Sequence, residues 1–95
     1  MSRSRVETIT VHHQGQTYRI ERSTTNQNDP AGSIHEYWPG HGVIGSHRKW
    51  LGHRYTRRLY WYAAINPTGQ PYKATRRAND LPTRRAAITW LLNHS

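Results

Sequence analysis

Two stretches of the chain have the sequence pattern of a β-strand, and in the first of them apolar and polar residues alternate. In the first stretch the alternating positions lie on both sides of Gln14-Gly15, and they are Ile9, Val11, Tyr18 and Ile20. A short glycine-containing turn between two such segments is typical of a β-hairpin. Residues 7 to 22 are therefore predicted to form a hairpin.

The second stretch covers residues 59 to 65 and is predicted to begin another hairpin. One face would carry Leu59, Trp61, Ala63 and Ile65, and the other would carry Tyr60, Tyr62 and Ala64. Asn66-Pro67-Thr68-Gly69 has the composition of a type I turn with glycine at the left-handed position. The return strand is predicted from about Gln70 to Arg77, with Tyr72, Ala74 and Arg76 alternating against Lys73, Thr75 and Arg77.

Near the end of the chain the spacing changes from two to that of a helix. The apolar positions Ala87, Ile88, Leu91 and Leu92 form one stripe on a helix from Arg84 to Asn93. Thr83 is a suitable N-cap, because its hydroxyl accepts a hydrogen bond from a free amide of the first turn. We expect this helix to pack on the sheet.

The rest of the chain is less regular. Residues 1 to 6 are predicted to be a flexible basic N-terminus, and residues 23 to 33, which hold only turn formers and small polar residues, a mobile loop. Residues 34 to 55 mix glycines, histidines and tryptophans and are predicted to form short strands and loops. The predicted fold class for residues 1 to 95 is a single α+β domain with a small twisted antiparallel sheet of four to six strands and one C-terminal helix.

Composition narrows the class of protein. Only 34% of the 95 residues are hydrophobic, so the core must be thin, although four Trp and six Tyr supply large rings. Cysteine is absent, which excludes disulfides and thiolate chemistry. No apolar run approaches the roughly 18 residues of a membrane span, so we expect a cytoplasmic protein with no membrane partner.

The strongest chemical signal is unbalanced positive charge. Lys and Arg number 14 against five Asp and Glu, and no acidic residue lies between Glu36 and Asp80. Unbalanced like charge destabilises a fold, so it favours a polyanionic partner over a merely solvated surface. The predicted nucleic-acid-binding residues are these cations and their polar neighbours: Arg48, Lys49, Arg54, Arg57, Arg58, Tyr60, Tyr62, Lys73, Thr75, Arg76 and Arg77.

The last third of the chain also resembles a known family. Tyr60-Trp61-Tyr62-Ala63-Ala64-Ile65, a glycine turn, a basic strand and the helix from Thr83 look like the arm-type, apetala-like amino-terminal DNA-binding domain of phage tyrosine recombinases. The resemblance covers residues 54 to 93, and Ala86 stands where that family usually has Glu. It implies a sheet that enters the major groove, with Arg58, Tyr60, Tyr62, Lys73 and Thr75 on or beside the reading face.

Catalytic and metal chemistry receive little support. His35, His41, His47 and His53 recur every six residues, whereas metal motifs usually place ligands two to five residues apart, so no metal site and no cofactor are predicted. No phosphate-binding loop or nucleophile motif is present, and no catalytic residue is predicted. Imidazoles titrate near neutrality, so we expect DNA binding to strengthen modestly at mildly acidic pH.

These observations lead to one main hypothesis and two alternatives. The main hypothesis is a non-catalytic, double-stranded DNA-binding accessory or regulatory protein of a phage or mobile element. The first alternative is a small adaptor or inhibitor that binds an acidic host protein, because arginine and aromatic residues also dominate protein interfaces. The second is single-stranded nucleic acid binding, in which the tyrosines of the sheet would stack on bases.

Overall fold

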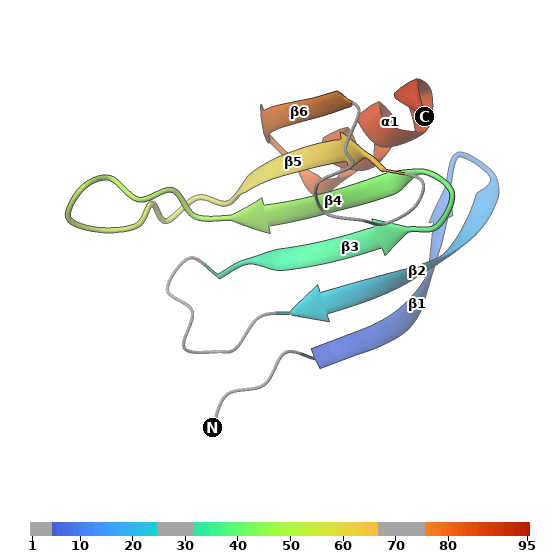
Figure 1. Cartoon of the computed structure of the whole chain (residues 1–95), viewed down its shortest axis with the longest axis horizontal. Helices are drawn as coiled ribbons and strands as arrows, with labels where there is room; N and C mark the ends of the chain where they lie inside the picture. Colours follow the sequence, from blue (N-terminus) through green and yellow to red (C-terminus); the bar gives the residue numbers. More distant parts are fainter. Residues whose placement is uncertain (1–4, 25–31, 67–75) are drawn as a thin grey trace.

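A computed structural model of the protein describes residues 5–24, 32–66 and 76–95 as one sheet and one helix (Figure 1). The six strands are antiparallel and lie in the sheet in the order in which they occur along the chain. The predicted α+β class with a C-terminal helix is confirmed. The elements are β1 Arg5–His13, β2 Gln16–Thr24, β3 Ile34–Trp38, β4 Gly42–His47, β5 Tyr60–Ile65, β6 Arg76–Leu81 and α1 Arg84–His94.

The first hairpin forms as predicted. Ile9 pairs with Ile20 across β1 and β2, and Gln14 (φ 50°) and Gly15 (φ 78°) make a turn with positive φ at both positions. Such a turn matches the right-handed twist of the two strands. Strand β1 begins at Arg5, inside the segment predicted as a flexible N-terminus, and β2 continues to Thr24. Of the rest of the predicted mobile loop, residues 25–31 lie outside the described residues.

Strands β3 to β5 form the centre of the sheet. The segment from residue 34 to 55 contains β3 and β4, and β5 alternates as predicted, with Ala63 and Ile65 buried in the core and Tyr60 and Tyr62 on the opposite face. Gly42 in β4 allows close strand pairing, because a Cβ there would lie only 2.1 Å from the carbonyl oxygen of Ala64.

The predicted end of the last strand was wrong. Strand β6 runs over Arg76–Leu81, past the predicted end at Arg77, and the part of the prediction from residue 67 to 75 lies outside the described residues. The register with β5 shifts between Trp61 and Ala63, and Asp80 has φ 60°. Asn and Asp usually end a strand, because both favour turns. Here Asp80 adopts a left-handed conformation, which aspartate tolerates, and the strand continues to Leu81.

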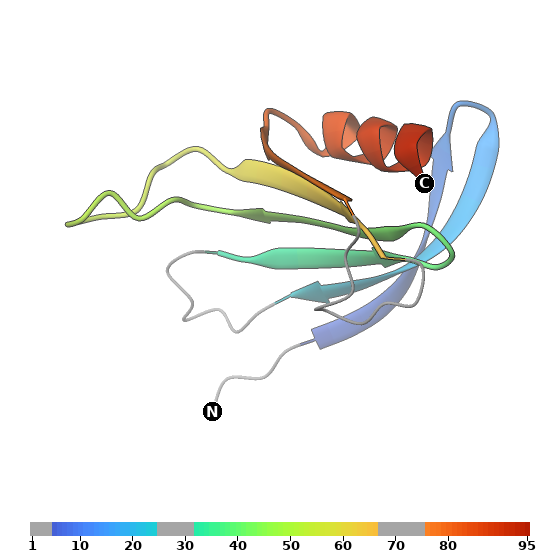
Figure 2. The same ribbon diagram turned by 45° about the horizontal axis from the view of Figure 1, so that its top comes forward.

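Helix α1 covers one face of the sheet over β4, β5 and β6 (Figure 2). The Thr83 hydroxyl accepts a hydrogen bond of 3.0 Å from the Ala86 amide, so the predicted N-cap is confirmed. Ala87, Ile88 and Leu91 are buried against the sheet, as the predicted apolar stripe required. The other face, here called the open face, is covered by no helix of the described chain.

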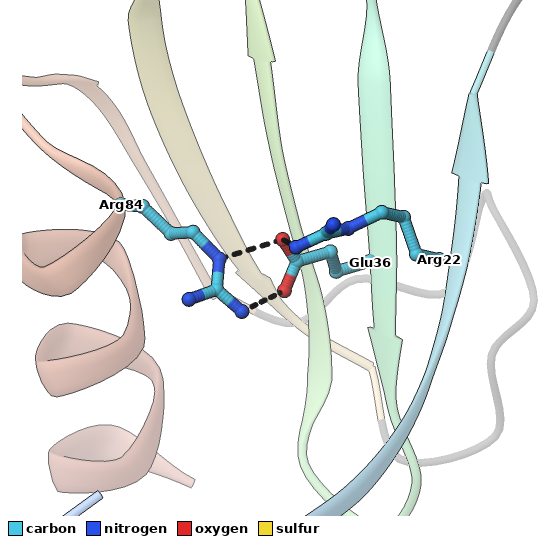
Figure 3. A network of polar contacts seen from close by, with 3 residues as sticks. All are labelled: Arg22, Glu36 and Arg84. Atoms are coloured by element: carbon cyan, nitrogen blue, oxygen red, sulfur yellow. Dashed lines mark hydrogen bonds and ion pairs between the residues drawn. The ribbon is translucent and has the colours of Figure 1, made fainter. Parts of the chain in front are cut away.

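A buried carboxylate ties the helix to the sheet (Figure 3). Glu36 on β3 has 1% of its side chain exposed and accepts hydrogen bonds from Arg84 Nε (2.7 Å) and Nη2 (2.9 Å) at the start of α1. Arg22 on β2 contacts the same carboxylate at 3.3 Å. Two arginines therefore neutralise the one acidic group of the core-facing side of β3.

None of the described helices is long and apolar enough to cross a membrane.

Candidate nucleic-acid interface

Residues 48–59, between β4 and β5, form a narrow two-stranded projection that extends well beyond the rest of the sheet (Figures 1 and 2). We call this segment the basic arm. The Thr56 amide donates to the Lys49 carbonyl (2.9 Å), the Leu51 amide donates to the Arg54 carbonyl (2.8 Å), and Trp50 pairs with Tyr55. Gly52 (φ 97°) makes the tip, where a positive φ lets the chain reverse within two residues.

Four arginines of the basic arm are exposed to solvent, and no acidic residue lies within the segment: Arg48, Arg54, Arg57 and Arg58. Lys49 differs from them, because it is only half exposed and forms an ion pair of 2.6 Å with Asp80 of β6. One predicted cation is thus balanced within the protein. The four arginines make the arm a strongly positive projection.

Tyr60 lies where the basic arm joins β5, and two cations lie over its ring. Lys49 Nζ is 4.3 Å and Arg58 Cζ is 5.4 Å from the ring centroid. Cations at this distance are attracted to the face of an aromatic ring. The contact orients Arg58 and links the base of the arm to the open face of the sheet.

Tyr62 lies next along the open face and is surrounded by basic residues. Arg77 of β6 stands over its ring at 4.5 Å, and His35 and His47 lie at 6.2 Å and 6.4 Å between ring centroids. Burial raises the pKa of the Tyr62 hydroxyl, and the positive charge of Arg77 partly opposes this rise. The ring rests on Gly45, where a Cβ would lie 2.6 Å from it.

A hollow of about 540 Å³ lies between the basic arm and Tyr60. Arginine forks suit phosphate oxygens and aromatic rings suit sugars or bases, so this hollow has the chemistry of a nucleotide-binding surface. It is lined by Leu51, Arg54, Tyr55, Thr56, Arg57, Arg58 and Tyr60.

The fold brings most of the predicted site residues together. Arg48, Lys49, Arg54, Arg57, Arg58 and Tyr60 lie on the basic arm or at its base, and Tyr62 and Arg77 continue the surface over the open face. Arg76 lies apart from them. It pairs with Ile65, whose side chain is in the core, so Arg76 is on the helix side of β6. Lys73 and Thr75 lie outside the described residues.

Two residues at the arm's end were missed by the sequence analysis. Trp50 is 58% exposed and Leu51 is 50% exposed, although both are large apolar side chains. The sequence does contain a signal for these two residues, because Trp50 and Leu51 stand directly before Gly52 in a segment rich in arginine. His35 and His47 were noted only for their spacing, whereas the fold places both beside Tyr62.

Of the four evenly spaced histidines, His35 and His47 lie beside Tyr62 and the other two lie elsewhere. His41 lies in the turn after β3, where its Nδ1 contacts the Ser95 hydroxyl at 2.7 Å, and His53 lies at the tip of the basic arm. Within residues 5–24, 32–66 and 76–95, no three His, Asp or Glu side chains are grouped closely enough to hold a metal ion.

Comparisons with known proteins give no relative from which a function could be transferred. No family model, no curated protein and no solved structure matches the chain. The resemblance to recombinase DNA-binding domains therefore stays a prediction.

Proposed function

We propose that this protein binds double-stranded DNA without catalysis, as an accessory or regulatory protein of a phage or mobile element. The observation that carries the proposal is the basic arm, which presents four exposed arginines and no acidic side chain on a two-stranded projection. The association with mobile elements comes only from the family resemblance of residues 54 to 93.

The two-stranded form of the arm supports a duplex as the ligand. The grooves of B-DNA are lined on both sides by phosphates, and two-stranded β-ribbons bind in the major or the minor groove. Arginines on both strands of such a ribbon reach phosphates on both sides of a groove. Phosphate contacts of this kind provide affinity that depends strongly on salt.

The open face adds a second group of contacts. Arg77 and Arg58 lie over tyrosine rings, so part of their side-chain freedom is already lost before binding. Cations held in this way need less ordering when they contact a phosphate. The proposed contact surface therefore runs from the arm across Tyr60 to Arg77 on β6.

The test is a mobility-shift titration on a duplex of random sequence over a series of salt concentrations. The test variant is Arg54→Ala with Arg57→Ala, on the arm. The control variant is Arg76→Ala with Arg85→Ala, which removes the same charge from the helix side of the protein, where both arginines are exposed. Each lost phosphate contact lowers the slope of log affinity against log salt by about 0.9, so the arm variant should lose about two units and the control little.

The same titration separates the alternatives. Equal loss in both variants would mean that net charge alone attracts DNA and that the arm has no special role. Tighter binding to the single strand of the same sequence would replace the duplex by a single-stranded ligand. Absence of binding to either at physiological salt would overturn the proposal and favour an acidic protein partner.

A further inference from the structure

Trp50 and Leu51 place the largest exposed apolar surface of the described chain at the end of its most positive projection. Only one other large apolar side chain among the described residues is comparably exposed, Val6, and it lies on β1 at the far edge of the sheet. Trp50 and Leu51 are consecutive in the sequence, and large apolar side chains left exposed at one end of an element usually mark a contact surface.

The surroundings of Trp50 and Leu51 identify the kind of surface they fit. Arg48 and Arg54 flank them in the sequence, and the hollow beside Leu51 is lined by three arginines. A matching partner must carry dense negative charge and must also have an apolar interior that is accessible between its negatively charged groups. A DNA duplex has this arrangement, because its base stack is apolar and lies between two rows of phosphates.

Contacts within the basic arm hold Trp50 and Leu51 in place at its end. The Trp50 ring packs on Tyr55 of the opposite arm strand, with 5.0 Å between ring centroids, so it is supported from behind. Backbone hydrogen bonds hold the arm up to Leu51 and Arg54, one residue from the tip. The basic arm is therefore held by backbone hydrogen bonds up to its tip, and its apolar side chains are exposed at that end.

We propose that Trp50 and Leu51 form a wedge that enters a base step of the duplex from the minor groove, partly unstacks it and bends the DNA. This inference rests on the proposed function and adds its mechanism: the arginines of the arm contact phosphates, and the wedge distorts the DNA between them. Apolar wedges inserted from the minor groove kink duplexes by about 20 to 90°, which opens the groove to a binding element. Binding should then favour flexible pyrimidine-purine steps.

The experiment measures energy transfer between dyes on the two ends of a duplex of about 20 base pairs, which is stiff on its own. Protein is added to saturation, which is established first by a mobility shift on the same duplex. Wild-type protein should bring the ends closer and raise transfer. Trp50→Ala with Leu51→Ala should bind about ten-fold more weakly, because a stacked base contact is lost, but at saturation should leave the duplex straight.

Controls separate the wedge from general damage to the protein. Val6→Ala removes an exposed apolar side chain from β1 and should bend DNA as wild type does. Trp50→Phe keeps a stacking ring and should keep most of the bend, and its salt slope should match that of wild type because no arginine is changed. A thermal melt of each variant verifies folding, and Leu51→Ala alone replaces the double variant if that variant is unfolded.

The outcomes distinguish this inference from the proposed function. A bend that is lost in the wedge variant while the salt slope stays unchanged supports both. Saturated binding of wild type to a duplex that stays straight overturns the wedge and leaves DNA binding intact. Absence of duplex binding overturns both, and the apolar arm end would then fit a pocket on an acidic protein.

Discussion

Replacement of Glu36 by Gln tests whether the buried ion network holds the helix on the sheet. The carboxylate is almost fully buried, and its oxygens face Arg84 from α1 and Arg22 from β2 (Figure 3). Glutamine keeps the size of the side chain but removes the charge and turns one acceptor into a donor. The donor would then face two guanidinium groups, which have no acceptor to offer.

The size of the effect follows from the contacts. Loss of one partner of a fully buried ion pair costs about 3–5 kcal/mol. Here the Arg84 and Arg22 side chains are 33% and 31% exposed, so solvent can partly rehydrate them and the cost is reduced. We therefore expect the free energy of unfolding to fall by about 2–4 kcal/mol, which lowers the melting temperature of a domain of this size by roughly 10–25 °C.

Urea denaturation at neutral pH measures this change, with the m-value checked for constancy between variants. Glu21→Gln is the matched control, since Glu21 lies on the neighbouring strand β2 with its side chain exposed on the other face. That control should change stability by less than about 0.5 kcal/mol. A Glu36→Gln variant as stable as the control would show that the network contributes nothing to the docking of α1.

A double-mutant cycle isolates the pair of Glu36 and Arg84. Arg84→Met keeps most of the apolar stem and removes the guanidinium. Because the two groups form two hydrogen bonds, of 2.7 Å and 2.9 Å, the two changes should be non-additive by about 1–3 kcal/mol. Additive effects would mean that each residue stabilises the fold through other neighbours.

Three further predictions concern the core and the open face. Leu91→Ala should lower the free energy of unfolding by about 2–4 kcal/mol, because Leu91 is fully buried between helix and sheet; a melt at wild-type temperature would contradict this packing. Gly42→Ala should cost about 3 kcal/mol or more in urea unfolding, since the added Cβ meets backbone rather than a movable side chain, and unchanged stability would show that β4 and β5 can separate there. Burial raises the pKa of Tyr62, so the folded state holds this proton more tightly than the unfolded state. The contribution of Tyr62 to stability should therefore be constant below the ordinary tyrosine pKa of about 10 and be lost as the pH rises through the raised pKa of the folded state, and this loss should be absent in Tyr62→Phe measured by urea denaturation across that pH range.

The elements that the sequence predicted correctly are those that depend on neighbouring residues. The alternation around Gln14-Gly15, the two faces of residues 59 to 65 and the cap at Thr83 are all local, because strand alternation, turn geometry and helix capping are decided within a few residues. The same local evidence placed the end of the last strand too early, at Arg77. Its end at Leu81 depends on pairing with Trp61 across the sheet, which no local pattern reveals.

The candidate site was predicted only in part, because the sequence shows where charges are but not which of them pair across the fold. Unbalanced charge between Glu36 and Asp80 is visible in the sequence, but only the fold shows that both of these acids are paired with cations, Asp80 with Lys49 and Glu36 with Arg84. These pairs join residues 31 and 48 positions apart, so no spacing rule could have found them.

The sequence by itself determined that the chain is basic, rich in aromatic residues and built from hairpins with a final helix. The tertiary structure decided which charges are left unpaired and where they project. Arg76 and Arg77 are neighbours in sequence, yet β-strand alternation sends one to the helix side and the other over Tyr62. The arm of residues 48–59 likewise exists only because β4 and β5 pair at its base, since an isolated two-stranded ribbon is at best marginally stable in water.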